Sequence, residues 1–168
     1  MKIVKGDLIK LALKGEFNII AHGCNCFCAQ KSGLAPQMVK AFQTNETFLE
    51  GDVNKAFGAI DVAKDKIGNI NKLGNIDVLD RKIPYKDGVF TLKVVNAYTQ
   101  FSMGTDKRHL DYEALTLCLR KINQIFPEKT IGLPKIGCGL AGGDWEMVKE
   151  IIEDELKDLN IIIVEYDK

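Results

Sequence analysis

The chain is predicted to fold as an α/β domain, with a central mixed sheet that helices cover on both faces. Short apolar runs of strand length alternate along the sequence with amphipathic stretches of helical length, and this alternation is typical of such layered folds. The runs are also nearly continuous in apolar residues, as expected of strands buried on both faces. The length of 168 residues, with no repeat or linker, predicts a single domain over residues 1–168.

The first part of the chain predicts two strand–helix units. A short strand is predicted over Lys2–Val4, followed by a helix that Asp7 caps. A second strand is predicted over Phe17–Ala21, and the next helix is expected to begin near Pro36, because proline is favoured in a first turn. The stretch 44–73 has weak periodicity and predicts no element.

The second part of the chain predicts a hairpin and two further strand–helix units. The segment Pro84–Gly88 is rich in turn residues and predicts a hairpin loop of four or five residues. Apolar stripes predict helices over Asp111–Phe126 and from Asp144 to about Leu156. Four apolar runs are predicted to be strands: Ile76–Ile83, Val89–Ala97, Thr130–Leu133 and Ile161–Val164.

The composition argues against several classes of function. Lysine plus arginine and aspartate plus glutamate number 23 each, so no global basic field favours nucleic acid as an obligate partner. No apolar run is long enough to span a bilayer, and the amino terminus lacks a signal-peptide pattern. The five cysteines do not predict a disulfide framework. We expect a cytoplasmic protein with no membrane partner.

Two glycine-rich loops follow predicted buried strands. The first loop runs from His22 to Ala35, and the second loop from Pro134 to Trp145. Ligands of open α/β sheets bind at the carboxyl ends of the strands, and free backbone amides before a helix bind phosphate. Two such loops at one end of a sheet predict a diphosphate site, although two tight turns serving the chain geometry alone are the alternative. Neither loop has a Walker ending or GxGxxG spacing.

Three motifs of the chain resemble those of macro domains. They are Val4-Lys-Gly-Asp-Leu8, Ala21-His-Gly-Cys-Asn25, and the stretch Leu133–Trp145, which reads Leu-Pro-Lys-Ile-Gly-Cys-Gly-Leu-Ala-Gly-Gly-Asp-Trp. The resemblance covers most of the chain outside residues 44–72. It implies a three-layer α/β/α macro-domain fold that binds ADP-ribose or ADP-ribose 1″-phosphate without a cofactor. The branch that it resembles includes ADP-ribose 1″-phosphate phosphatases and terminal ADP-ribose protein glycohydrolases.

The resemblance also implies roles for individual residues. Asp7 would accept a hydrogen bond from the adenine amino group, and Asn25 would face the distal ribose. Asp7 as a helix cap and Asn25 as a turn residue are the alternatives. The other residues implied to contact the ligand are Leu8, Cys24, Ser32, Gly33, Leu34, Lys135, Ile136, Gly137, Cys138, Gly139, Leu140 and Ala141.

The predicted catalytic residues are His22 and Asp144, which would act at the distal ribose as general acid or base. The alternatives are a structural histidine and a helix N-cap, and His109 is expected to be a surface or cap residue. The resemblance implies that glycohydrolases use a lysine and an acid, whose positions fall near Tyr98 and at Ala141 in this chain. Because both groups are absent, hydrolysis of ADP-ribose 1″-phosphate to ADP-ribose and phosphate is favoured. Hydrolysis of ADP-ribosylated protein or nucleic acid and non-catalytic binding remain alternatives.

A cysteine cluster in the first loop raises the possibility of a metal site. Cys24, Cys26 and Cys28 alternate along the chain beside His22, and thiolate and imidazole groups are zinc ligands. The spacing differs from a Cys-x-x-Cys knuckle and no second cluster supports it, so we expect small buried side chains and no metal. Phe27 is open to stacking on the distal ribose or to packing, and the helical stripe favours a core position for Trp145.

Overall fold

The computed structural model describes residues 1–46 and 68–167. Its centre is a six-stranded sheet with the strand order β1-β6-β5-β2-β4-β3. Neighbouring strands pair in parallel, except β3, which is antiparallel to β4. The strands are β1 (Lys2–Gly6), β2 (Ile19–Asn25), β3 (Ile76–Tyr85), β4 (Gly88–Gln100), β5 (Thr130–Leu133) and β6 (Asn160–Tyr166). The predicted mixed sheet is therefore confirmed.

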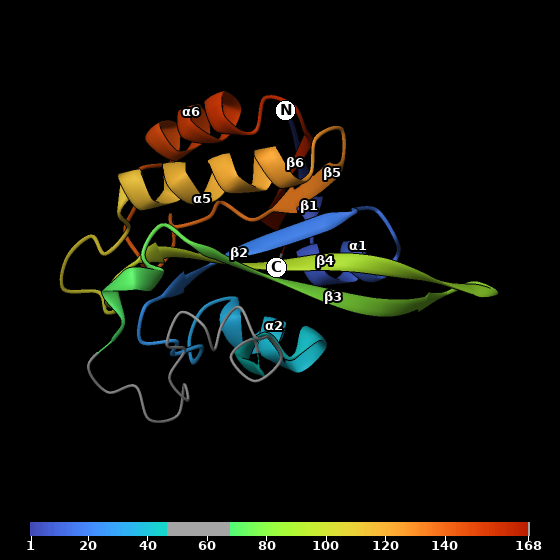
Figure 1. Cartoon of the computed structure of the whole chain (residues 1–168), viewed down its shortest axis with the longest axis horizontal. Coiled ribbons are helices and arrows are strands. Elements are labelled where there is room, and N and C mark those ends of the chain that lie inside the picture. The colour runs from blue at the N-terminus through green and yellow to red at the C-terminus, as the bar shows by residue number, and fades with distance from the viewer. Residues whose placement is uncertain (47–67, 168) are drawn as a thin grey trace.

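Helices cover both faces of this sheet, which gives the three layers that the sequence predicts. α5 and α6 lie on one face, and α1 and α2 lie on the other (Figure 1). Short 3-10 helices follow α2 and precede β3. The helices are α1 (Leu8–Leu13), α2 (Ala35–Phe42), α5 (Tyr112–Ile125), α6 (Trp145–Glu155), η1 (Thr44–Glu46) and η3 (Ile70–Lys72). Among the described residues, none of the helices has the length and apolar character needed to cross a membrane.

Alternating side chains of the strands fill two apolar cores. On β2, Ile19 and Ala21 belong to the core under α5 and α6, whereas Ile20 belongs to the core under α1 and α2. All three side chains are fully buried. This alternation follows from the two-residue period of a strand. Burial on both faces explains why the sequence shows continuous apolar runs in place of an alternating pattern.

Several strand boundaries differ from the sequence-based prediction, and two of the differences change the extent of a predicted loop. The predicted loop beginning at His22 is wrong at its start, because β2 continues to Asn25 through parallel pairing with β4. The hairpin loop of four or five residues is also wrong. Tyr85 pairs with Gly88, so Lys86 and Asp87 alone form the turn. Lys86 adopts a positive φ of 51°, a conformation that the sequence gives no reason to expect of lysine.

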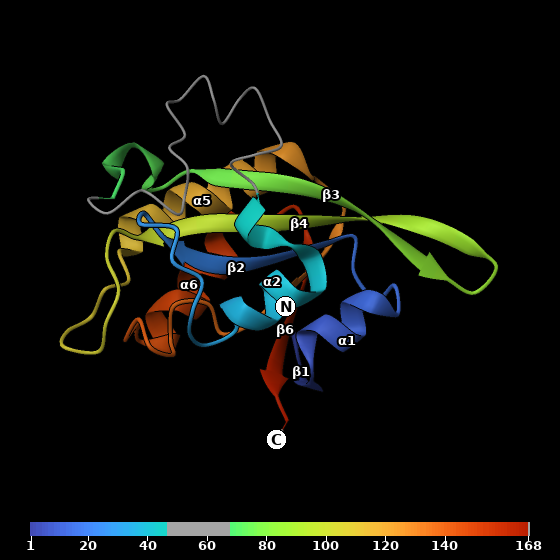
Figure 2. The ribbon, with the colours of Figure 1, turned by 90° about the horizontal axis from the view of Figure 1, so that it is seen from below.

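Five strands end at the same edge of the sheet because they run in parallel. Their last residues are Gly6, Asn25, Gln100, Leu133 and Tyr166. The β3–β4 hairpin reaches beyond the other strands at the opposite end, as the view turned by 90° shows (Figure 2). The segments that follow β2 and β5 are the two glycine-rich loops. The fold therefore brings both loops to one edge, as the sequence predicts.

Candidate functional site

Two adjoining cavities lie along the carboxyl edge of the sheet. The Asp7 cavity has a volume of about 510 Å³, and the His22 cavity one of about 530 Å³. Both are lined by Gly33, Leu34, Pro134, Lys135 and Gly139, so they form one continuous trench between the two loops.

Each cavity has its own further lining. The Asp7 cavity is also lined by Gly6, Asp7, Leu8, Gln37, Cys138, Val164, Glu165 and Tyr166. The His22 cavity is also lined by His22, Gly23, Cys24, Asn25, Ala29, Gln30, Ser32, Ala35, Gln100, Met103, Gly104, Thr105, Ile136, Gly137, Leu140 and Ala141. Every predicted site residue except Asp144 thus lines the trench.

The waist of the trench lies where the two loops approach each other. A Cβ atom at Gly33 of the first loop would lie 3.8 Å from Leu140 Cδ1 of the second loop. Gly33 also has a φ of +66°, which favours glycine. The Leu140 side chain is about half exposed and therefore forms part of the rim. A ligand that fills both cavities has to pass through this waist.

Two features of the loops that border the waist favour an anion. Aspartate side chains cap α1, α5 and α6, but α2 begins after Leu34 without a side-chain cap. Within the described part of the chain, the N–H groups of Gly139, Leu140 and Ala141 also make no hydrogen bond. Unpaired N–H groups and an uncapped helix start attract anions. The waist is therefore suited to a diphosphate.

The glycines of the second loop serve two different purposes. A Cβ atom at Gly137 would lie 2.6 Å from Leu110, and one at Gly143 would lie 2.7 Å from the Gly137 carbonyl oxygen. These two glycines are needed for packing. Gly139 differs, because a Cβ atom there would meet nothing within 4 Å. Its open side belongs to the trench, which both cavities share at this residue.

His22 lies within β2, and its side chain is 2% exposed. Its Nε2 is 2.6 Å from Asn96 Oδ1, and Asn96 Nδ2 donates to the Thr44 carbonyl oxygen over 2.8 Å. Because the Asn96 amide donates to Thr44, its oxygen must accept from His22, and Nε2 therefore carries the proton. The same Thr44 exchanges two hydrogen bonds with Gln30, a residue that lines the His22 cavity.

This environment makes His22 a poor proton donor at neutral pH. Burial lowers the pKa of His22 to about 4, although the hydrogen bond that His22 donates to Asn96 raises it in part. Nδ1 is buried and has no partner among the described residues. The neutral ring bonds to Asn96, which bonds to Thr44, and Thr44 bonds to Gln30. This chain of hydrogen bonds favours a structural role for His22 in holding Gln30 and the first loop in place. The predicted role of general acid finds no support in this geometry.

Asn25 organises the first loop and also faces the His22 cavity. Its Oδ1 accepts hydrogen bonds from the backbone N–H groups of Phe27 and Ala29, each over 3.1 Å. Its Nδ2 donates to the Ala29 carbonyl oxygen over 2.9 Å. This bond uses one of the two Nδ2 hydrogens. Both readings of Asn25, as a turn residue and as a ligand of the distal ribose, are thus compatible with its position.

The cysteine cluster is packed as a small apolar core. Cys24, Cys26 and Cys28 are buried beside Tyr98. Burial, followed by the neighbouring Cys28, raises the pKa of Cys24 well above its usual value, so the thiol stays protonated. No group of three or more His, Cys, Asp or Glu side chains within residues 1–46 and 68–167 is arranged to hold a metal ion.

Asp144 lies outside both cavities. Its Oδ1 accepts hydrogen bonds from Glu146 N over 2.8 Å and Met147 N over 3.4 Å, so it is the N-cap of α6. Because it caps a helix and lines neither cavity, its position gives no support to its predicted catalytic role. His109, expected to be a surface or cap residue, has a side chain that is 6% exposed and pairs with Asp106 over 2.7 Å.

Phe27 and Trp145 both pack against other side chains. Phe27 contacts Phe101 edge-on with the ring centroids 5.3 Å apart, and it does not line the trench. Trp145 is half-buried against the core under α5 and α6. Lys135 Nζ lies 5.2 Å from the centroid of its ring.

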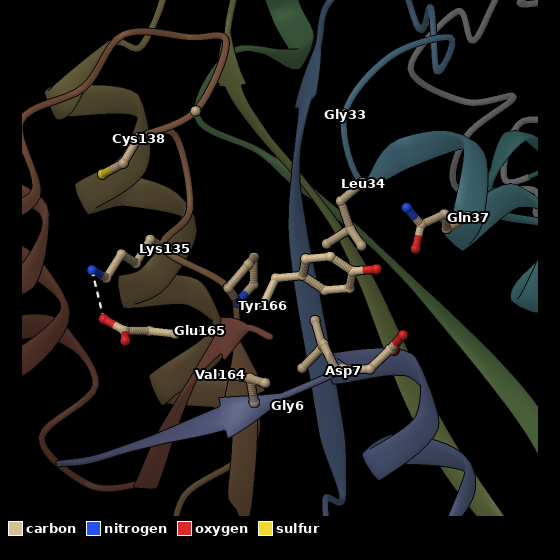
Figure 3. Close-up of a pocket in the computed structure, with 13 residues that line it drawn as sticks. Gly6, Asp7, Gly33, Leu34, Gln37, Lys135, Cys138, Val164, Glu165 and Tyr166 are labelled. Carbon is tan, nitrogen blue, oxygen red and sulfur yellow. Dashed lines mark ion pairs between the residues drawn. The ribbon is translucent and has the colours of Figure 1, made fainter. Parts of the chain in front are cut away.

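Several residues that line the trench were not predicted from the sequence. The most informative are Tyr166 and Glu165, at the carboxyl end of β6. Tyr166 is 66% exposed, and its ring extends into the Asp7 cavity between Leu34 and Asp7 (Figure 3). Glu165 Oε1 pairs with Lys135 Nζ over 2.6 Å. The rule that ligands bind at the carboxyl ends of parallel strands, applied to the last apolar run, is the signal that points to both residues.

Solved structures of low sequence identity share this fold. A macrodomain of Thermus aquaticus DarG is 20% identical with a TM-score of 0.62, covering 99% of this chain and 97% of that one. Thermosipho africanus DarTG in complex with ADP-ribose is 18% identical with a TM-score of 0.66, covering 98% of this chain and 40% of that one. The fold is that of a macro domain.

One curated protein is similar along its full length. It is an uncharacterized 17.5 kDa protein from the tk–vs intergenic region of enterobacteria phage T4, 33% identical over 172 residues, covering 99% of this chain and 97% of that protein. The chain belongs to the same family as this phage protein. No protein-family model matches the sequence.

The buried His22 predicts a specific pH dependence of stability. The folded pKa of about 4 lies below the ordinary histidine pKa of 6.5, so the unfolded chain binds the proton first as the pH falls. The free energy of unfolding should therefore fall between pH 6.5 and 4, by up to about 3 kcal/mol. Urea unfolding of the wild type and of His22→Asn at several pH values measures this. We expect His22→Asn to lose this part of the pH dependence. Parallel curves of the free energy of unfolding against pH for the two proteins would contradict the lowered pKa of His22.

Proposed function

We propose that the protein binds ADP-ribose along the trench. Adenine and its ribose would occupy the Asp7 cavity, the diphosphate the waist, and the distal ribose the His22 cavity. The observation that carries the proposal is the waist itself, where uncapped α2 and unpaired amides of the second loop meet between two cavities of similar volume. Proteins of the same fold that hold ADP-ribose, such as DarTG of Thermosipho africanus, support it.

The Asp7 cavity has features that suit a purine base. Asp7 Oδ1 accepts a hydrogen bond from Lys10 N over 3.0 Å, which leaves Oδ2 for the adenine amino group. The exposed ring of Tyr166 offers a flat surface on which a base can stack. Leu8 and Val164 add apolar lining. One carboxylate and one aromatic ring thus provide both specificity and contact area.

Asp7→Asn separates ligand binding from helix capping. Asparagine caps a helix about as well as aspartate, but its single oxygen is then used by Lys10 N. The adenine amino group would face an amide donor in place of an acceptor. We expect the affinity for ADP-ribose, measured by calorimetric titration, to fall on the order of tenfold. Asp111→Asn, the same change at the N-cap of α5, should keep the wild-type affinity; equal affinities in both variants would contradict the adenine contact.

Gly139→Val tests the path of the diphosphate. The added side chain meets no protein atom within 4 Å of its Cβ, so we expect the free energy of unfolding to be nearly unchanged. It would instead fill the trench where the diphosphate passes, and calorimetry should detect little or no ADP-ribose binding. Gly88→Val is the matched control, since a Cβ atom there also meets nothing within 4 Å and Gly88 lies in the hairpin. Tight binding by Gly139→Val would exclude this path.

Hydrolysis of ADP-ribose 1″-phosphate is the activity that we propose for the site. The His22 cavity is as large as the Asp7 cavity, although it has to hold a ribose alone, so room remains for a phosphate on the distal ribose. Ala141 and the buried Tyr98, which bonds to Asp77 over 2.6 Å, stand where glycohydrolases are expected to have their catalytic groups. No carboxylate lines the His22 cavity among the described residues, so we expect slow turnover.

Phosphate release from ADP-ribose 1″-phosphate tests this activity. We expect slow release by the wild type, loss of release in Gly139→Val, and unchanged release in Asp144→Asn because Asp144 lies outside the trench. Binding of ADP-ribose without release would favour a reader or an enzyme acting on ADP-ribosylated protein or nucleic acid. A loss of release in Asp144→Asn would restore Asp144 as a catalytic residue.

A further inference from the structure

The charges that line the trench are few and arranged in a particular way. Among the described residues, the charged side chains of the Asp7 cavity are Asp7, Glu165 and Lys135. With both carboxylates ionised, the formal charge of this cavity is −1. Lys135 is also the only lysine or arginine in the described lining of the His22 cavity. The trench therefore has one cation to offer to a ligand with several negative charges.

That cation is already engaged by Glu165. Lys135 Nζ lies 2.6 Å from Glu165 Oε1, and it also lies over the Trp145 ring. Figure 3 shows the Lys135 side chain turned toward Glu165 at one side of the cavity. The hydrogen bond and charge of Lys135 lower the pKa of Glu165, so its carboxylate stays ionised at neutral pH. About a third of each side chain is exposed, so a ligand can reach the pair.

The pair lines the cavity that would hold the adenosine ribose in the proposed pose. In ADP-ribose this ribose joins the base to the diphosphate, so in the proposed pose it lies between the Asp7 end and the waist. Lys135 and Glu165 line the same cavity there, and Lys135 also lines the waist. The diphosphate itself is served by neutral backbone amides and does not require a free lysine. The charges of the pair would therefore act on any group attached to the hydroxyls of that ribose.

We propose that the Lys135–Glu165 pair makes the trench selective against nucleotides with a further phosphate on the adenosine ribose, and that Glu165 is the specificity-determining residue. This rests on the proposed function. A phosphate at the 2′ position would add up to two negative charges to a cavity whose formal charge is already −1. Its natural counter-ion, Lys135, is neutralised by Glu165. Specificity would thus come from an unfavourable charge as well as from attractive contacts.

Titration with ADP-ribose and 2′-phospho-ADP-ribose tests the proposal. We expect the wild type to bind ADP-ribose more tightly than the 2′-phosphorylated form. Glu165→Gln keeps the size of the side chain but leaves Lys135 with a net positive charge. The ratio of the two affinities should then shift toward the phosphorylated form on the order of tenfold. The readout is the ratio of the two affinities, because Glu165 also lines the cavity that would hold ADP-ribose itself.

Two controls separate this effect from other causes. Glu155→Gln makes the same change in an ion pair with Arg120, whose Nη2 is 2.9 Å from Glu155 Oε1, outside the trench, and should leave the ratio unchanged. The double variant Lys135→Met with Glu165→Gln should abolish the shift of the affinity ratio toward the phosphorylated form. Equal affinities of the wild type for both ligands, or an unchanged ratio in Glu165→Gln, would overturn the inference. Failure of the wild type to bind ADP-ribose would instead overturn the proposed function.

Discussion

The parallel pairing of β2 with β4 and β5 is the constraint on which the trench depends. It places the carboxyl ends of β2 and β5 side by side, so the first and second loops leave the sheet as neighbours. Full burial of Ile19 and Ile131, which are register partners on these strands, makes a slip of register costly. The distance between the loops, and hence the width of the waist, follows from this pairing.

The trench has little positive charge with which to bind an anion. The chain has no net charge, and the described lining of the trench has one cation that an acidic neighbour neutralises. An anionic ligand would therefore be held by oriented backbone dipoles. Such donors have a fixed geometry, whereas long basic side chains adapt to many anions. A trench lined by such donors would discriminate between anionic ligands by the position of each phosphate.

Much of the fold could be predicted because its signals are local. The helices of residues 111–126 and 144–156 follow from apolar stripes and Asp caps, and the structure has α5 and α6 there. The end of β2 could not be predicted, because His22 and Gly23 have no strand pattern of their own. Their place depends on Asn96 and Thr99 of β4, about 75 residues away in sequence.

In the candidate site, too, the features with a local signal could be predicted from the sequence, and those set by long-range contacts could not. The glycine-rich loops could be identified from the sequence as the borders of the proposed diphosphate site, because a close approach of backbone to ligand favours glycine. An N-cap and a catalytic carboxylate look alike in a sequence, so the sequence alone does not show that Asp144 caps α6 outside the trench. Tyr166 carries no local motif at all. It becomes part of the site because β6 lies next to β1, which is a property of strand order.

The unpaired amides of Gly139, Leu140 and Ala141 have a consequence for how such a site can diverge. A backbone donor is present at every residue except proline, so most substitutions along the loop do not remove it. Proline, a side chain that fills the open side of a glycine, or a change in the path of the chain would do so. A phosphate site built from such donors would therefore tolerate extensive sequence drift.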